Sequence, residues 1–245
     1  MKTAVVIMSR VPEPGFTKTR LSDKISEDEC AEFHRACLRD ICRVVRQSEM
    51  SGFIYYVGPG DRPGGMEFTA WGLPAEDYGY FCFCPQKGAD LGERMANAAA
   101  EVLSRYDGVI LLGSDMPCLT PRLLQETDER LHDHDLVIGP ADDGGYYLLG
   151  CKRVNKDLFQ DIPWGTSEVL HHTLQASEKH RQSVYTLAEQ RDIDTWTDLI
   201  AFYGEGMNES ESNELDSYKY AAKLISKYDC RERDELFGCK VEKNG

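Results

Sequence analysis

Residues 107–118 read DGVILLGSDMPC, an apolar run that is followed by a small residue, a carboxylate and a proline. Such a short apolar run is typical of a strand that is buried on both faces of a sheet. Asp115 therefore stands just past the end of a predicted strand. Aspartate favours turns, but a carboxylate at this place can also meet a ligand or a metal ion, and the sequence leaves both interpretations open.

Other apolar runs alternate with helical patterns along the chain. Strands are predicted at 3–8, 52–57, 80–84, 108–113, 135–140, 146–150 and 183–187, and helices are expected to begin near residues 26, 90, 120, 167 and 195. The first helix opens with a capping box at Ser26 and Glu29. This order favours a mainly parallel sheet between helices, with ligands beyond the carboxyl ends of the strands, where Asp115 is expected to lie.

The composition limits the classes of partner. The 245 residues include 28 Lys and Arg against 42 Asp and Glu, which gives a net charge of -14. Nucleic acid is not an expected partner, since it needs a basic face, whereas carboxylates suit a divalent cation. No apolar run approaches the roughly 18 residues of a membrane span and no secretory signal is evident, so a cytoplasmic location is expected. The nine cysteines form no repeated CxxC pair and are expected to be reduced.

The sequence changes character near residue 205. The stretch GEGMNESESNELD is polar and aperiodic, and SYKYAAKLISKY after it has the pattern of a short helix. We therefore expect one domain at 1–204 and a polar linker with a helical extension at 205–245. The extension docks either on the domain or on a second subunit, and the latter would make a homodimer.

A basic loop, SRVPEPGFTKTRL at 9–21, follows the first predicted strand. Loops at this place commonly bind phosphate, and Lys18 and Arg20 can neutralise phosphate oxygens. The loop has neither the GxGxxG nor the GxxxxGK[ST] pattern, which disfavours dinucleotide oxidoreductases and P-loop kinases. The alternative is a surface loop shaped by its prolines, with solvated cations.

A second candidate segment, QKGADLGERM at 86–95, lies at a predicted strand-to-helix junction. Asp90 and Glu93 are spaced as a helix-capping pair. Arg94 lies off the apolar stripe of the helix, where it can reach a phosphate or simply be solvated.

The segment GPADDGGYYLLG at 139–150 has the pattern of a β-hairpin. Asp142 and Asp143 would stand on its tip, available to substrate hydroxyls or to a cation. Gly144 and Gly145 would permit a close approach of the backbone.

Two further segments carry candidate groups. In IPWGTS, at 162–167, Trp164 is either a stacking surface or an anchor in the core. In RDIDTWTDL, at 191–199, Thr195 and Asp198 are spaced as a cap pair, and Asp194 just outside that helix is free to be a second metal ligand.

Taken in order, PEPGFTKTRL, KGADLGERM, GSDMP, DGGYYLLG, IPWGT and DIDTWTDL resemble the GT-A-like nucleotide-diphospho-sugar transferases, including selenodomain-associated transferase 1. The resemblance covers residues 1 to about 204 and implies a Rossmann-like α/β fold with a small antiparallel hairpin. It also implies relation to the nucleotidyltransferases that build activated sugars, molybdenum cofactors and deazaflavin cofactors, and a nucleotide bound with Mg²⁺ or Mn²⁺.

The resemblance also implies roles for individual residues. Lys18 and Arg20 match the basic loop that holds the triphosphate, Asp115 matches the metal aspartate, and Asp194 resembles the second metal aspartate of sugar-acid cytidylyltransferases. Two departures are visible: the basic loop contains proline where relatives have GxGTR, and Ser-Asp-Met stands where glycosyltransferases usually have DxD.

The expected function is a metal-dependent transferase that moves a glycosyl or nucleotidyl group from a nucleotide or nucleotide sugar to a small acceptor. Lys18, Arg20 and Asp115 are expected to carry catalysis, and Asp115 and Asp194 to hold the metal. The substrate-binding candidates are Asp90, Arg94, Asp142, Asp143, Gly144, Gly145 and Trp164. The alternative is an inactive nucleotide-binding module that acts through its tail. A phosphatase is disfavoured because VVIMSR lacks a DxD near the first strand.

Overall fold

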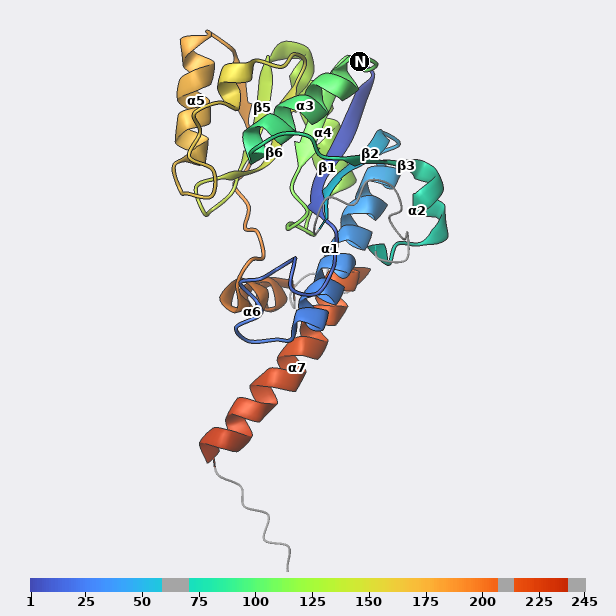
Figure 1. Cartoon of the computed structure of the whole chain (residues 1–245), viewed down its shortest axis with the longest axis vertical. Helices are drawn as coiled ribbons and strands as arrows, with labels where there is room; N and C mark the ends of the chain where they lie inside the picture. Colours follow the sequence, from blue (N-terminus) through green and yellow to red (C-terminus); the bar gives the residue numbers. More distant parts are fainter. Residues whose placement is uncertain (59–70, 207–213, 238–245) are drawn as a thin grey trace, which may run out of the picture.

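The computed structural model describes residues 1–58, 71–206 and 214–237 (Figure 1). Within these residues the strands form one sheet in the order β3-β2-β1-β4-β6-β5-β7. The strands are β1 (Thr3–Arg10), β2 (Ser51–Val57), β3 (Phe81–Pro85), β4 (Gly108–Leu112), β5 (Leu136–Pro140), β6 (Tyr146–Cys151) and β7 (Val184–Thr186). The seven predicted strands are thereby confirmed.

The sheet is mixed but mostly parallel. β1 pairs parallel with β2 and β4, β2 with β3, and β5 with β7, whereas β6 runs antiparallel to both β4 and β5. The β5–β6 hairpin that GPADDGGYYLLG predicts is therefore present, inserted with its second strand beside β4. Because of these directions, one edge of the sheet holds the hairpin tip and the carboxyl ends of β1, β2, β3, β4 and β5.

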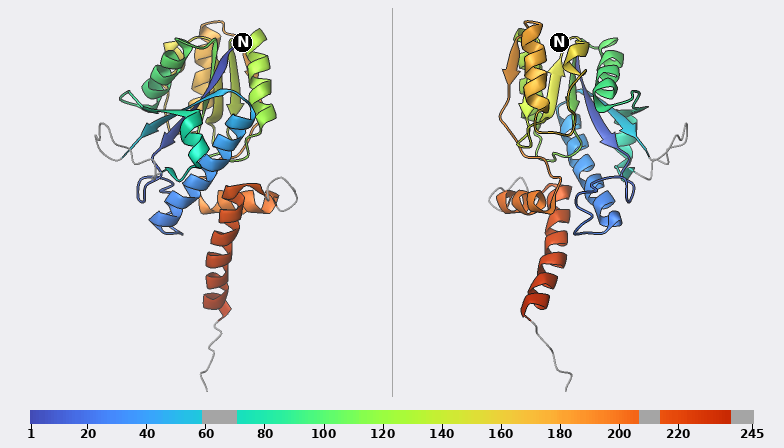
Figure 2. Two further views of the ribbon diagram at one scale, coloured as in Figure 1. Left: turned by 90° about the vertical axis from the view of Figure 1, so that its right-hand side faces the viewer. Right: turned by 60° about the vertical axis from the view of Figure 1, so that its left-hand side comes forward.

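Helices cover both faces of the sheet (Figure 1, Figure 2). They are α1 (Glu27–Gln47), α2 (Ala75–Tyr80), α3 (Leu91–Leu103), α4 (Pro121–Asp133), η2 (Lys156–Leu158), α5 (Val169–Lys179), α6 (Trp196–Gly206) and α7 (Asp216–Phe237). In β1, Val5 and Ile7 face the core that α1 and α4 cover, and Ala4 and Val6 face the core under α3. This alternation is the two-residue period of a strand with two buried faces.

The capping signals act as the sequence predicts. Ser26 and Glu29 form a complete capping box on α1. Asp90 accepts from the Glu93 amide at the start of α3, and Thr120 accepts from the Leu123 amide at the start of α4. The short helices α2 and η2 are additions that the sequence did not predict. None of the helices in the described part combines the length and apolar character needed to cross a membrane.

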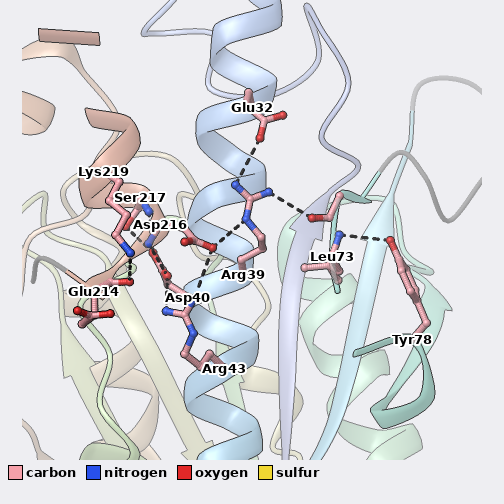
Figure 3. Close-up of polar contacts among 11 residues, drawn as sticks. Glu32, Arg39, Asp40, Arg43, Leu73, Tyr78, Glu214, Asp216, Ser217 and Lys219 are labelled. Carbon is pink, nitrogen blue, oxygen red and sulfur yellow. Dashed lines mark hydrogen bonds and ion pairs between the residues drawn. The ribbon is translucent and has the colours of Figure 1, made fainter. Parts of the chain in front are cut away.

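The first half of α7 packs against α1 of the same chain, and its second half runs away from the sheet (Figure 1, Figure 2). The contact is partly apolar, through a third core that joins the loop after β1, α1, α6 and α7. It is also polar (Figure 3): the fully buried carboxylate of Asp40 accepts from the backbone amides of Asp216 and Ser217, each at 2.9 Å, and from the Ser217 hydroxyl at 2.6 Å. Asp40 thus caps α7 from a neighbouring helix.

Arg39 and Arg43 extend this polar contact between α1 and α7 (Figure 3). Arg39 donates to Asp216 at 3.0 Å and to Glu32 at 3.3 Å, and Arg43 donates to Asp40 at 2.9 Å. In this structure the extension docks on its own chain, and docking on a second subunit stays a prediction. The expected start of the linker at 205 still belongs to α6, and the rest of the polar stretch, 207–213, lies outside the described residues.

Candidate functional site

A pocket of about 540 Å³ opens at the shared edge of the sheet. Its floor is formed by the ends of β1 and β4, and its walls by the loop after β1, the segment after β3, the hairpin tip and the segment 192–194. The last segment is brought there by a bridge between Ala141 and Gln190 and by a hydrogen bond from the Ile193 amide to the Asp115 carbonyl at 3.2 Å. The pocket therefore lies where ligands bind in open α/β sheets.

Asp115 and Lys18 form an ion pair at the floor of this pocket. The Lys18 Nζ lies 2.5 Å from Asp115 Oδ1, and the lysine side chain is only 1% exposed whereas that of Asp115 is 43% exposed. Burial lowers the pKa of Lys18, but Asp115, Cys37 and Asp194 together more than offset this and raise it above its usual value. Burial likewise raises the pKa of Asp115, and the ammonium lowers it below the usual range. Both groups are therefore ionised at neutral pH.

The Lys18 ammonium is fully engaged by protein groups. Besides Asp115 it donates to the Ile193 carbonyl at 2.5 Å, and it lies 3.7 Å from Asp194 Oδ1. Its backbone has a left-handed φ of 50°, which turns the side chain back under the loop. In this structure the charge of Lys18 acts on the two aspartates, and its contact with phosphate oxygens stays a prediction.

Arg20 is the exposed cation of the same loop. Its side chain is 66% exposed, and Nη1 lies 3.2 Å from Asp194 Oδ2. Arg10 and Arg94 also line the pocket, and Arg94 is oriented by a hydrogen bond from Nε to the Gly88 carbonyl at 3.1 Å. Three arginines, rather than Lys18, therefore offer positive charge to an anionic ligand.

Four aspartates line the pocket, and one of them is absent from the five that the sequence predicts for the site. Asp115, Asp143, Asp192 and Asp194 all line it. Burial and the neighbouring carboxylates of Asp194, Asp143 and Asp115 raise the pKa of Asp192 to about 6. Asp192 was not among the predicted site residues, although its i, i+2 spacing to Asp194 was a signal for it.

The hairpin tip separates its two acids. Asp143 lines the pocket, and its Oδ1 accepts from the Gly145 amide at 2.8 Å. Asp142 is outside the pocket, where it accepts from Arg191 Nε at 2.9 Å. Gly145 lines the pocket but Gly144 does not; a Cβ on Gly144, at φ 88°, would lie 2.2 Å from the Ser167 carbonyl oxygen. Gly144 thus allows the hairpin to approach the chain before α5 rather than a ligand.

Of the remaining predicted residues, Trp164 lines the pocket and Asp90 does not. Asp90 does not line the pocket and serves as the α3 cap. Trp164 lines the pocket and also packs against the core, with its ring edge-on to that of Tyr146 at 6.3 Å between centroids and its indole directly over Gly92. The packing agrees with the anchor interpretation of Trp164, and its role as a stacking surface stays a prediction.

Gln86 is a pocket residue that the sequence did not single out. Its amide nitrogen donates to the carbonyls of Tyr55 at 2.9 Å and Ser9 at 3.2 Å. Both donor hydrogens are thereby engaged, so Oε1 remains as an acceptor with a fixed position.

The donor chemistry of the pocket fits a hard divalent cation, because carboxylate oxygens are the ligands that Mg²⁺ and Mn²⁺ prefer. One cation is already held there: the ammonium of Lys18 lies between Asp115 and Asp194. In the part of the chain that the structure describes, no three His, Cys, Asp or Glu side chains converge as a ready-made metal cluster. The fit is therefore one of donor type, since the four aspartates of the pocket are matched in number by Lys18 and three arginines.

Comparisons with known proteins agree with this fold. A family model described as "Uncharacterized protein conserved in bacteria (DUF2064)" matches residues 55–166. A crystal structure from Desulfovibrio desulfuricans G20, assigned as a nucleotide-diphospho-sugar transferase, is 33% identical and has a TM-score of 0.83, over 93% of this chain and 98% of that chain. No curated protein matches the chain.

Two more distant structures are similar in fold alone. CMP:2-keto-3-deoxy-manno-octonic acid synthetase, in complex with CTP, is 12% identical with a TM-score of 0.52, over 85% of this chain and all of that chain. A cytidylyltransferase from Leptospira borgpetersenii serovar Hardjo-bovis is 14% identical with a TM-score of 0.52, over all of this chain and 98% of that chain.

Proposed function

Since the chain belongs to the bacterial DUF2064 family and is related to a nucleotide-diphospho-sugar transferase, we propose that it is a metal-dependent transferase that binds a nucleotide or a nucleotide sugar. It transfers a glycosyl or nucleotidyl group to a small acceptor. The observation that carries the proposal is the Asp115 carboxylate, which is half exposed in the pocket and held ionised by a buried ammonium.

The pocket suits a nucleotide in size and in charge. Its volume of about 540 Å³ is in the range of small-molecule sites. Arg10, Arg20 and Arg94 supply the positive charge for phosphate groups. The fixed acceptor of Gln86 and the ring of Trp164 suit the edge and face of a base or sugar.

Asp115 and Asp194 would hold the divalent cation, with Asp192 beside them. When bound, the cation would neutralise phosphate oxygens and stabilise charge that develops on them during transfer. Lys18 keeps Asp115 ionised and therefore ready to accept a cation at neutral pH. The chain needs no covalent intermediate, because positioning and charge stabilisation are sufficient for this class of reaction.

The acceptor is proposed to bind at the hairpin tip. Asp143 is exposed there and lines the pocket, so it can accept hydrogen bonds from acceptor hydroxyls. Asp142 has no part in this proposal because Arg191 engages it. The domain at 1–204, the extension at 205–245, a cytoplasmic location and a homodimer also remain proposals.

The test is product identification by mass spectrometry. The purified full-length chain is incubated with Mg²⁺ or Mn²⁺, a panel of nucleoside triphosphates and nucleotide sugars, and a panel of small acceptors. Release of pyrophosphate identifies nucleotidyl transfer, and release of a nucleoside diphosphate identifies glycosyl transfer. Asp115→Asn should abolish either product, while Asp133→Asn, on the exposed end of α4, should leave it unchanged.

A second candidate function is nucleotide binding without turnover, in a module that acts through a partner. It is favoured by the engagement of Lys18 with Asp115 and Ile193, since this lysine is not free to meet a phosphate. Tight nucleotide binding without any product across the panels would support this candidate against the transferase.

A further inference from the structure

His34 is a buried imidazole on α1 that lines the pocket. Its Nδ1 lies 2.5 Å from the Thr17 hydroxyl. Its Nε2 lies 3.1 Å from the Ser114 hydroxyl and 3.3 Å from the Ser9 hydroxyl. All three hydroxyl-bearing residues are themselves buried, so one ring connects three separate segments of the chain.

Each of these three hydroxyl residues immediately precedes a charged residue of the pocket. The pairs are Ser9 with Arg10, Thr17 with Lys18, and Ser114 with Asp115. The segments come from the end of β1, the basic loop and the turn after β4. The ring therefore sets the relative position of three backbone points from which pocket charges project.

The hydrogen bonds define the protonation of the ring. Burial lowers the pKa of His34 to about 3, with Lys18 and Arg10 adding to this effect and Asp115 opposing it, so the imidazole is neutral. The Ser9 hydroxyl donates to the Arg10 carbonyl at 2.8 Å and can only accept from the ring. Nε2 is therefore the protonated nitrogen, and Nδ1 accepts from Thr17.

We propose that His34 is a positioning residue that holds Lys18 against Asp115 and fixes both relative to Arg10. The role of this positioning in ligand binding rests on the proposed function, whereas the positioning itself does not depend on it. A phenylalanine would fill the space of the ring but remove its contacts with all three hydroxyls, of which, within the described part of the chain, only Ser9 keeps another partner, so the segments would lose their common attachment. In metal sites, partners that orient the ligands typically contribute about 10-fold to 100-fold to metal affinity or activity.

Lysine labelling tests the positioning without any nucleotide. The folded full-length chain is treated with acetic anhydride, and acetylation of each lysine is measured by mass spectrometry. Lys18, which is 1% exposed, should be protected in the wild type. In His34→Phe its acetylation rate should rise about tenfold, because loss of the buried hydrogen bonds lets the loop open more often and expose the amine.

A matched control separates positioning from general loosening. Thr127→Val removes another buried hydroxyl, which donates to the Leu123 carbonyl within α4, away from the pocket. Lys18 should stay protected in this variant. His34→Gln keeps a donor that can reach Ser114 and should restore most of the protection. Protection of Lys18 in His34→Phe, or equal labelling in Thr127→Val, would overturn the proposal.

Thr17→Val serves as the second variant if His34→Phe does not fold. It removes only the Nδ1 contact, and Lys18 labelling must still rise in it for the proposal to stand. A parallel titration with Mg²⁺ and nucleoside triphosphates separates this proposal from the proposed function. Absence of binding by the wild type would refute the nucleotide site, whereas the labelling result tests the positioning role of His34 independently of any nucleotide.

Discussion

Removal of the Lys18 charge by Lys18→Met should destabilise the protein, because Asp115 and Asp194 would then face each other without a counter-ion. The bare Coulomb attraction at the 2.5 Å separation of Lys18 and Asp115 is about 7 kcal/mol at an effective dielectric constant of about 20, and about 2 kcal/mol at about 80. Because Asp115 is 43% exposed, solvent screening favours the lower figure. We therefore expect a coupling energy of about 2 kcal/mol.

A double-mutant cycle measures this coupling directly. Urea unfolding of the wild type, Lys18→Met, Asp115→Asn and the double variant gives four free energies of unfolding. Asp115→Asn should recover much of the stability that Lys18→Met loses. The exposed pair of Arg20 and Asp194 is the control, and its cycle should give less than about 0.5 kcal/mol. A coupling energy for Lys18 and Asp115 as small as that of the control would refute the assignment of Lys18 as the counter-ion.

Three further outcomes are expected. Burial raises the pKa of Glu29, but hydrogen bonds, first of all from Lys227 and Tyr228 of α7, lower it from 4.5 to about 2. The stabilising effect of the ionised carboxylate is therefore present above about pH 4.5 and is lost as the pH falls towards 2. The free energies of unfolding of the wild type and Glu29→Gln should converge over that range. Asp40→Ala should lower the free energy of unfolding in urea by about 2–4 kcal/mol, because the amides that open α7 lose a buried acceptor. Gly144→Ala should cost more than about 2 kcal/mol in the same assay, since its Cβ would clash with Ser167, whereas Gly113→Ala, with open space around it, should be tolerated.

The sheet could be predicted from the sequence because its signals are local. Each strand is a short apolar run, and the first three long helices begin at side chains that cap them, such as Ser26 and Thr120. Asp115 could be located for the same reason, since it follows a strand with apolar residues throughout. The short helix α2 carries no side-chain cap and begins after Pro74, so the sequence contains no comparable signal that predicts it.

The site was less predictable because its decisive contacts join distant segments. Lys18 meets Asp194 only after the Ala141–Gln190 bridge and the Ile193–Asp115 hydrogen bond have brought the segment 192–194 to the pocket, and no local pattern indicates that pairing. Asp142 and Asp143 are neighbours in the chain, yet the hairpin directs one to Arg191 and the other to the pocket. His34 lies on an amphipathic helix, where the sequence alone cannot distinguish a core histidine from one that holds the site.

The central claim is that the Asp115 carboxylate, kept ionised by Lys18, is where a cation and a nucleotide phosphate bind together. Calorimetric titration of Mn²⁺ with a panel of nucleoside triphosphates and nucleotide sugars into the wild type and Asp115→Asn tests it most directly. We predict that the wild type binds at least one of these pairs and that Asp115→Asn weakens that binding by about tenfold or more, with Asp133→Asn unchanged. Equal affinity of the wild type and Asp115→Asn would contradict the account.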